Sequence, residues 1–498
     1  MDLRAVLRLL PSFKVDRCSP IIHSASLMEE SSIEVSISTP PNQQNRDIIS
    51  SLPDDVVCHI LSYLETKEAI GTTILSKRWR HAWTGLVDFK FDDQNYILEG
   101  ANFFGRFVDK VLLVHRGAIK SLRFDTRCFP HEHMNPWIRA AAMQNVEELS
   151  ISTDYSIKKS YLSIPQTLFS CKTIRFLQLY FRVDFRVIHD SVVWLPSLKV
   201  LHLNFVYSFD SLTIHKILAN APVLEELLIY TQLPPNYGSN TLRIQSSSLK
   251  RFFVQSFETP AGANGSRMVI KAPKLEYLLL HDSNSEEFEI ERLSSLAYAH
   301  IDVRYLRNNI NHVSYANQVV NLLRKINNVK VLRLQASVLE ALAKASDDNF
   351  PSFLNLVQLK LKAEQNDWQM LPKMLHSSPK LEVLTLIRKA PREAIFKEES
   401  MIFKEESVPK CLLSSLETLE FKDFEGNAAE MQILEYILKK ASLLKMFRIS
   451  LSATIDSDKE KHTLSKLVKF SEGANTCRML VTRRFKKTPK SFAYFMGL

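Results

Sequence analysis

The segment LSKRWRHAW, at positions 75–83, combines aromatic and cationic side chains that could bind nucleic acid. Trp79 and Trp83 could stack on bases while the neighbouring lysine and arginines contact phosphates. At helical spacing, however, Leu75, Trp79 and Trp83 fall on one apolar face, and the cations lie mainly elsewhere. Base stacking needs aromatic rings displayed together with cations. We therefore expect packed tryptophans in this segment and no binding to nucleic acid.

The rest of the sequence contains no recognised catalytic motif. HExxH, GxSxG, P-loop and kinase signatures are absent, so we predict a non-enzymatic protein without a cofactor. Cys128, His131 and His133 lie close together, but no fourth ligand stands at a familiar zinc spacing. We expect a loop at this position and no metal site.

The composition limits the compartment. The six cysteines form no CxxC pair, as is typical of free thiols in a reducing compartment, so nucleus and/or cytoplasm are expected. The first residues contain arginine and few acids, which also fits an organelle transit peptide, although a disordered extension is favoured. No apolar run approaches the roughly eighteen residues that span a bilayer, so no membrane partner is expected.

Positions 46–84 predict a compact helical unit. Val56, Val57, Ile60, Leu61 and Leu64 recur at helical spacing after the helix-starting sequence SLPDD. A second apolar series, also at helical spacing, comprises Ile70, Ile74, Leu75, Trp79 and Trp83. A unit of about forty residues buries little surface and is stabilised by pairing with other helices.

Beyond this unit, a six-residue pattern of the form apolar-x-x-apolar-x-apolar recurs with a mean period of about 27 residues. Its first positions are Ile119, Val146, Ile174, Leu198, Leu224, Leu249, Leu275, Leu296, Val329, Leu356, Leu381, Leu416 and Leu444. The period predicts a leucine-rich-repeat solenoid, in which each repeat adds one short strand and its apolar residues point inward. Because the repeat length varies, we expect an irregular arc.

The residues between and just after the inward leucines would line the concave face of this arc. As target-binding candidates we select Tyr180, His202, Tyr230, His281, His300, Arg333, Lys360 and Lys362. Such a mixed polar and aromatic surface is the usual capture site of solenoids, although a solvated strand surface would show the same residue types. The basic cluster of Arg333, Lys360 and Lys362 favours an acidic target.

The segment SLPDDVVCHILSYLETKEAIGTTILSKRWRHAW resembles an F-box, with its Leu-Pro entry and terminal LSKRW. The segment from Val408 to Ile449, with its PKCL and FEG motifs, is similar to the FBD domain. An F-box followed by leucine-rich repeats and an FBD domain resembles the large plant F-box/leucine-rich-repeat family.

This resemblance implies the substrate receptor of a Skp–cullin–F-box ubiquitin ligase. The F-box would dock on the Skp-type adaptor, and through it on the cullin, while the repeats and FBD region capture an unknown protein target. By analogy, the adaptor contacts fall on Leu52, Pro53, Ile60, Leu61, Leu64, Leu75, Ser76 and Trp79. The alternative is a repeat scaffold that has an F-box but acts outside a ligase, with nuclear or nucleic-acid-associated partners.

The expected fold is an α/β solenoid in which a small all-α F-box unit precedes an irregular leucine-rich-repeat arc with parallel strands and a concave sheet. The arc ends in an FBD-like α+β segment. The expected organisation is a disordered extension over 1–45, the F-box over 46–90, leucine-rich repeats over 91–400, the FBD domain over 401–475 and a basic tail over 476–498.

Overall fold

A computed structural model describes most of the chain between positions 52 and 483. The described residues are 52–96, 101–115, 117–126, 134–153, 162–180, 183–184, 192–205, 211–232, 241–257, 266–283, 285–304, 312–345, 350–389, 407–472 and 477–483. Leu52–Arg483 forms one compact unit. The expected N-terminal extension, the Cys128, His131 and His133 cluster and the chain beyond Arg483 lie outside the described residues.

The first described segment is helical, as its apolar spacing predicts. It consists of α2 (Asp54–Leu61), α3 (Thr66–Gly71), η2 (Thr72–Ile74), α4 (Trp79–Ala82) and η3 (Trp83–Gly85). Asp54 and Asp55 lie in the first turn of α2, where acidic side chains complement the helix dipole. The second apolar series forms several short pieces and not one helix, because Gly71 and two threonines interrupt it with weak helix formers.

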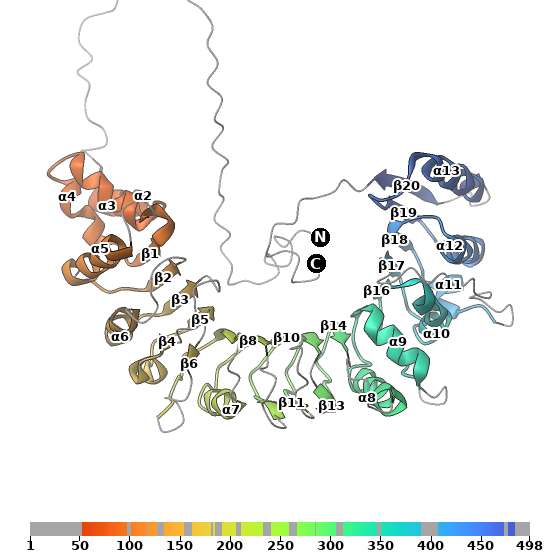
Figure 1. Ribbon diagram of the computed structural model, residues 1–498, viewed down its shortest axis with the longest axis horizontal. Helices are drawn as coiled ribbons and strands as arrows, with labels where there is room; N and C mark the ends of the chain where they lie inside the picture. Colours follow the sequence, from red (N-terminus) through yellow and green to blue (C-terminus); the bar gives the residue numbers. More distant parts are fainter. Residues whose placement is uncertain are drawn as a thin grey trace, which may run out of the picture. The chain divides into compact units, whose positions relative to one another are not determined.

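Fifteen parallel strands form the main sheet. They are β1 (Asp88–Asp92), β2 (Ser121–Thr126), β3 (Glu148–Thr153), β5 (Phe176–Tyr180), β7 (Val200–Phe205), β8 (Glu226–Gln232), β10 (Arg251–Phe257), β12 (Tyr277–Asp282), β14 (Tyr298–Val303), β15 (Val331–Leu334), β16 (Gln358–Ala363), β17 (Val383–Arg388), β18 (Thr418–Phe424), β19 (Met446–Leu451) and β20 (Arg478–Arg483). Each strand pairs in order with the next repeat's strand, so the sheet is the continuous surface that the repeat period predicts (Figure 1).

Helices cover the outer side of this sheet, opposite its curved inner face (Figure 1). They are α5 (Ala101–Val114), α6 (Asn135–Met143), α7 (Ser211–Ala219), α8 (His312–Lys325), α9 (Ala336–Lys344), α10 (Leu371–His376), α11 (Lys410–Ser414), α12 (Ala428–Lys440) and α13 (Ser457–Glu472), with short 3-10 turns η4 (Asp93–Tyr96), η6 (Gln166–Ser170) and η9 (Gln365–Met370). In the central repeats a small parallel sheet of β9 (Thr241–Gln245), β11 (Ser266–Lys271) and β13 (Ser285–Ile290) takes the helices' place. A two-stranded pair, β4 (Leu162–Ser163) with β6 (Val183–Asp184), lies outside both sheets.

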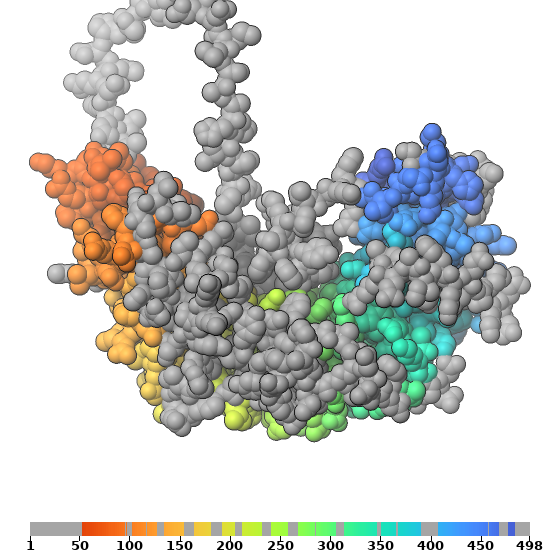
Figure 2. Space-filling view, in the orientation of Figure 1, coloured from red at the N-terminus to blue at the C-terminus, as the bar shows by residue number. Residues whose placement is uncertain are grey.

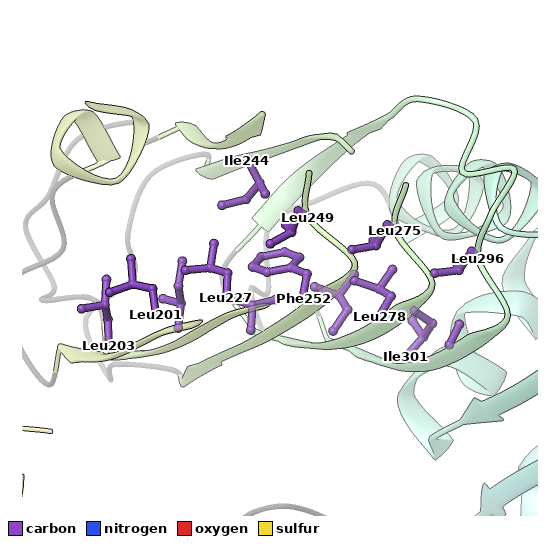
Figure 3. Packing of buried hydrophobic residues seen from close by; sticks show 14 of the residues in the cluster. Leu201, Leu203, Leu227, Ile244, Leu249, Phe252, Leu275, Leu278, Leu296 and Ile301 are labelled. Atoms are coloured by element: carbon purple, nitrogen blue, oxygen red, sulfur yellow. The ribbon is translucent and has the colours of Figure 1, made fainter. Parts of the chain in front are cut away.

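The core is a ladder of the inward apolar residues of successive strands. Leu201, Leu227, Phe252 and Leu278 occupy the same place in consecutive repeats and are almost fully buried, as Figure 3 shows. Ile244, from the small outer sheet, packs into the same core. Burying each such side chain stabilises the fold by roughly 1.5–3 kcal/mol, and no repeat could bury its apolar face alone. The predicted solenoid is confirmed.

The sheet extends further than the repeat pattern predicts. β1 precedes the first predicted repeat, and β20 pairs with β19 from Met446↔Arg478 to Leu451↔Arg483. The prediction of a basic tail from 476 is therefore wrong for its first residues, because Arg478–Arg483 is the last strand of the sheet. The FBD-like segment contributes β18, β19 and α12 to the same solenoid.

Two further observations concern membrane-spanning helices and metal sites among the described residues. None of the helices in the described segments is both long and apolar enough to cross a membrane. Within the same segments, no three histidine, cysteine, aspartate or glutamate side chains gather as metal ligands would.

Candidate functional site

The helical unit exposes a group of large apolar side chains. They are Val56, Ile60, Tyr63, Leu64, Ile74 and Leu75. Ile74 is 88% exposed and Leu75 is 64% exposed, although leucine and isoleucine are usually buried. The unit forms part of the molecular surface at the N-terminal end of the described chain (Figure 2). Six large apolar side chains exposed within one small unit make it a candidate protein-binding surface.

The apolar residues of α2 divide between two faces. Val56 and Ile60 are spaced four apart and exposed, whereas Val57 and Leu61 are buried in the core. Leu64, three residues after the end of α2, is also exposed. The interface prediction for Leu61 therefore needs correction, because its side chain is fully enclosed by the unit itself.

The other predicted adaptor contacts, most of them in the segment 75–83, differ in how far they are exposed. Trp79 is buried and packs in the core, as expected for a structural tryptophan, so it supports the surface from within. The hydroxyl of half-buried Ser76 accepts a hydrogen bond from the Trp79 amide at 3.4 Å. Leu52 packs partly against the core, while Pro53 and Leu75 are exposed. Adaptor binding by Leu52, Pro53 and Leu75 stays a prediction.

One of the cations beside the tryptophans is structural. Arg78 donates to the carboxylate of Asp54, with Nη2 2.6 Å from Oδ1, and to the backbone carbonyl of Leu52. It thereby ties the start of α2 to the segment before α4, about 24 residues later in the chain. Trp79 and Trp83 are buried, so their rings are unavailable for base stacking.

The sheet register places the predicted target-binding residues on one face. Tyr180, Tyr230 and His281 occupy one row across the strands, and His202, His300, Arg333 and Lys360 occupy the neighbouring row, with Lys362 two residues beyond Lys360. Tyr180, Tyr230, His281, Arg333, Lys360 and Lys362 are half-buried on this face. The prediction fails for His202 and His300, which are only 1% and 6% exposed and make contacts inside the face.

His202 belongs to a buried ionic network on the concave face. Its Nε2 lies 2.7 Å from Oε1 of Glu226, and Nε of Arg251 donates to Oε2 of Glu226 at 2.6 Å. Burial alone would raise the pKa of Glu226, but the hydrogen bonds and charges of His202 and Arg251 hold this pKa below its usual value. Both carboxylate oxygens are thus satisfied, and three neighbouring strands are joined by one carboxylate.

A second network, centred on Asp302 of β14, lies three strands beyond Glu226 of β8. Asp302 accepts from His281, with Nδ1 2.9 Å from Oδ2, from Arg304 at 3.1 Å and from the Ser337 hydroxyl at 2.7 Å. Burial would raise the pKa of Asp302, but these partners hold it well below its usual range. His300 lies beside this network, where burial lowers its pKa to about 3, so it stays neutral and bonds to Gln335 at 3.0 Å.

The FBD-like segment contains a buried carboxylate that shapes the turn before α12. Oε2 of Glu430 accepts the backbone N–H groups of Glu425, Gly426 and Asn427 at 3.0, 2.8 and 3.3 Å. Gly426 has a φ of 71°, and a Cβ there would meet the Thr463 hydroxyl at 2.5 Å. The FEG motif therefore encodes this turn.

Burial raises the pKa of Glu430 to about 7, although the three N–H groups lower it. A folded-state pKa above the unfolded one means that stability is greatest below the unfolded value of 4.5 and falls as pH rises through about 7. We expect Glu430→Gln to remove up to about 3 kcal/mol of this pH dependence. Urea unfolding of both proteins at pH 5 and pH 8 tests it, and an unchanged difference between the two pH values would contradict it.

Sequence reasoning missed a third row of concave residues. The residue just before the second apolar position of a repeat also lies on the concave face. This row includes Glu226, Arg251, Tyr277 and Tyr298. The signal was present in the alternation of a strand, which places positions two apart on the same face. Glu430 gave the weaker signal of a capping box, Asn427-x-x-Glu430.

Comparisons with known proteins match the F-box unit, a large part of the repeats and the FBD-like segment. A family model of the F-box domain matches residues 49–91, one of the leucine-rich repeats of FBD-associated F-box protein At5g56370 matches 134–346, and one of the FBD domain matches 404–449. The F-box/FBD/LRR-repeat protein At5g56420 of Arabidopsis thaliana is 30% identical over 87% of this chain and 99% of its own length. The F-box/FBD/LRR-repeat protein At1g78750 of the same plant is also 30% identical, over 87% of this chain and 96% of its own.

Proposed function

The chain belongs to the F-box/FBD/LRR-repeat protein family, and on this premise we propose that it is the substrate-recognition subunit of a Skp–cullin–F-box ubiquitin ligase. In this role the F-box unit binds the Skp-type adaptor and the concave face of the repeats captures a protein target. Ubiquitin transfer belongs to other subunits, which fits the absence of a catalytic motif in the sequence.

One observation carries the proposal. The F-box unit packs one side of α2 into the core through Val57 and Leu61, and leaves the other side apolar and exposed through Val56 and Ile60, with exposed Leu64 just after the helix. An exposed row of apolar residues spaced four apart on a helix is the feature that docks against a partner's helices. The contact with a Skp-type adaptor follows from the family, since F-box domains bind such adaptors.

The test is reconstitution of the complex. The full chain is co-expressed with a Skp-type adaptor, purified and mixed with a cullin, and the complexes are separated by size-exclusion chromatography. We expect a stoichiometric adaptor complex that recruits the cullin. Failure to bind the adaptor would overturn the proposal. An adaptor complex that excludes the cullin would instead favour the scaffold function outside a ligase.

We also propose that the protein works in the nucleus and/or cytoplasm. Cys58, Cys171, Cys411 and Cys477, the cysteines of the described segments, are all free thiols, as is usual in a reducing compartment. A fluorescent fusion tests this location, and import into an organelle would contradict it.

A further inference from the structure

Three cations, Arg333, Lys360 and Lys362, lie next to one another on the concave face. Arg333 of β15 is the direct register partner of Lys360 of β16, and Lys362 lies two residues further on the same face. We call these three residues the cationic cluster. Like charges directly opposite each other on neighbouring strands destabilise a sheet. Burial, and then the nearby charges of Arg333 and Lys422, lower the pKa of Lys360 to about 8.

Three carboxylates near the cationic cluster are bonded to other cations. Asp302 pairs with Arg304 at 3.1 Å, Glu420 pairs with Lys422 at 3.1 Å and Glu364 pairs with Lys389 at 2.5 Å. Within the described part of the chain, neither Lys360 nor Lys362 has a hydrogen-bonded or ion-paired partner. The two ammonium groups therefore keep their capacity to bind an anion from outside.

An aromatic pair borders the cationic cluster on the side of β14. The rings of Tyr277 and Tyr298 stack with centroids 4.0 Å apart and planes 5° apart. The Arg333 guanidinium lies 5.2 Å from the Tyr298 ring centroid, and Phe253 packs 5.2 Å from Tyr277 on the other side. Because these ring faces are already occupied, they do not offer the free stacking surface that nucleic-acid bases need. Both tyrosines are half-buried, and their remaining exposed apolar surface suits an apolar side chain.

We propose that the cationic cluster binds an acidic segment of the target protein, bearing carboxylate or phosphate groups, and that an apolar side chain of the same segment lies against the Tyr277–Tyr298 pair. This inference rests on the proposed function and names the chemistry of its target. Measured across the strands, Tyr277 and Lys360 are three strand spacings apart, roughly 14 Å, and an extended chain advances about 3.3 Å per residue. The apolar and acidic residues of the segment are therefore expected about four positions apart.

The experiment uses the full chain in complex with its adaptor and a fluorescein-labelled peptide of twelve residues. The peptide is built of glycine and serine, with one leucine and, four positions later, two glutamates. A second peptide replaces the glutamates by glutamines, a third replaces them by phosphoserines, and a twelve-nucleotide oligouridine replaces the peptide altogether. Fluorescence anisotropy gives each Kd, and comparison of the glutamate and phosphoserine peptides distinguishes carboxylate from phosphate as the preferred anion.

Lys360→Gln/Lys362→Gln is the test variant. The matched control is Lys250→Gln/Lys445→Gln, which removes the same charge from lysines that pair with Glu225 at 3.1 Å and Glu417 at 2.7 Å. We expect the acidic peptides to bind the wild type and the control alike, and the test variant at least about tenfold more weakly. Because the interaction is electrostatic, added salt weakens it.

Three results would overturn the inference: neither acidic peptide binding more tightly than the glutamine peptide, equal binding of the acidic peptides by test variant and wild type, or tighter binding of oligouridine than of either acidic peptide. Adaptor binding is measured on the same samples. Loss of adaptor binding in the wild type would count against the proposed ligase function, whereas intact adaptor binding without peptide selectivity counts against the acidic target alone.

Discussion

Replacing Glu226 by alanine is expected to lower the free energy of unfolding by about 3–5 kcal/mol. The Glu226 side chain is fully buried and bonds to His202 on β7 and to Arg251 on β10. Its removal leaves the Arg251 guanidinium and the buried imidazole without their shared carboxylate, and an uncompensated buried charge is far costlier than a lost surface pair. Urea unfolding followed by circular dichroism measures the loss.

The neighbouring residue provides the control for this substitution. Glu225 is half-exposed and pairs with Lys250 at 3.1 Å, so Glu225→Ala is expected to cost under about 1 kcal/mol. Hydrogen exchange locates the effect, because a solenoid need not unfold in one step. Loss of protection is expected first in β7, β8 and β10. Equal destabilisation by the two alanine substitutions would contradict a special role for the buried carboxylate.

This network also limits which part of the concave face can bind a target. On β7 and β8, His202 and Glu226 bond to each other within the concave face and are buried there. Around β15 and β16, Lys360 and Lys362 remain accessible and unneutralised among the described residues. The first region therefore stabilises the sheet, and the second has the charge for the target binding that we propose.

Sequence periodicity predicts the scaffold well because it records burial directly. A leucine such as Leu227 cannot be exposed without a cost of roughly 1.5–3 kcal/mol, so the repeat leaves a clear trace. Hydrogen bonds between polar side chains leave no periodic pattern in the sequence. Glu226, for example, bonds to residues about 24 positions away in both directions. The sequence alone therefore places His202 among the binding candidates, because it does not show that Glu226 lies beside it.

The F-box surface shows a related limit of the sequence. Periodicity identifies Ile60 and Leu61 alike as apolar, yet Ile60 is 39% exposed and Leu61 is buried. Which of two adjacent apolar residues faces the core depends on how the later segments α4 and η3 pack against α2, and the broken second helix could not be foreseen from spacing alone. The exposed group includes Ile74, which spacing had assigned to a helix face.

The double substitution Ile60→Asp/Leu75→Asp is expected to weaken binding to the Skp-type adaptor by at least about 100-fold. Both side chains are exposed in the free protein, so aspartate at these positions costs the fold little. In a complex, each aspartate would carry a charge into an apolar interface, and an unpaired buried charge costs several kcal/mol. Surface plasmon resonance with the immobilised adaptor measures the loss, and circular dichroism checks that folding is unchanged.

Two comparisons make this result specific to the surface. Leu113→Asp/Leu212→Asp carries the same charge on exposed leucines outside the F-box unit and should bind the adaptor like the wild type. Leu61→Ala should instead lower the free energy of unfolding by about 2–5 kcal/mol, because it opens a cavity in the core. Adaptor binding lost equally in the Leu113→Asp/Leu212→Asp control would indicate a general charge effect. Binding retained by Ile60→Asp/Leu75→Asp would mean that the adaptor contacts the protein elsewhere, since no apolar docking surface tolerates two buried carboxylates.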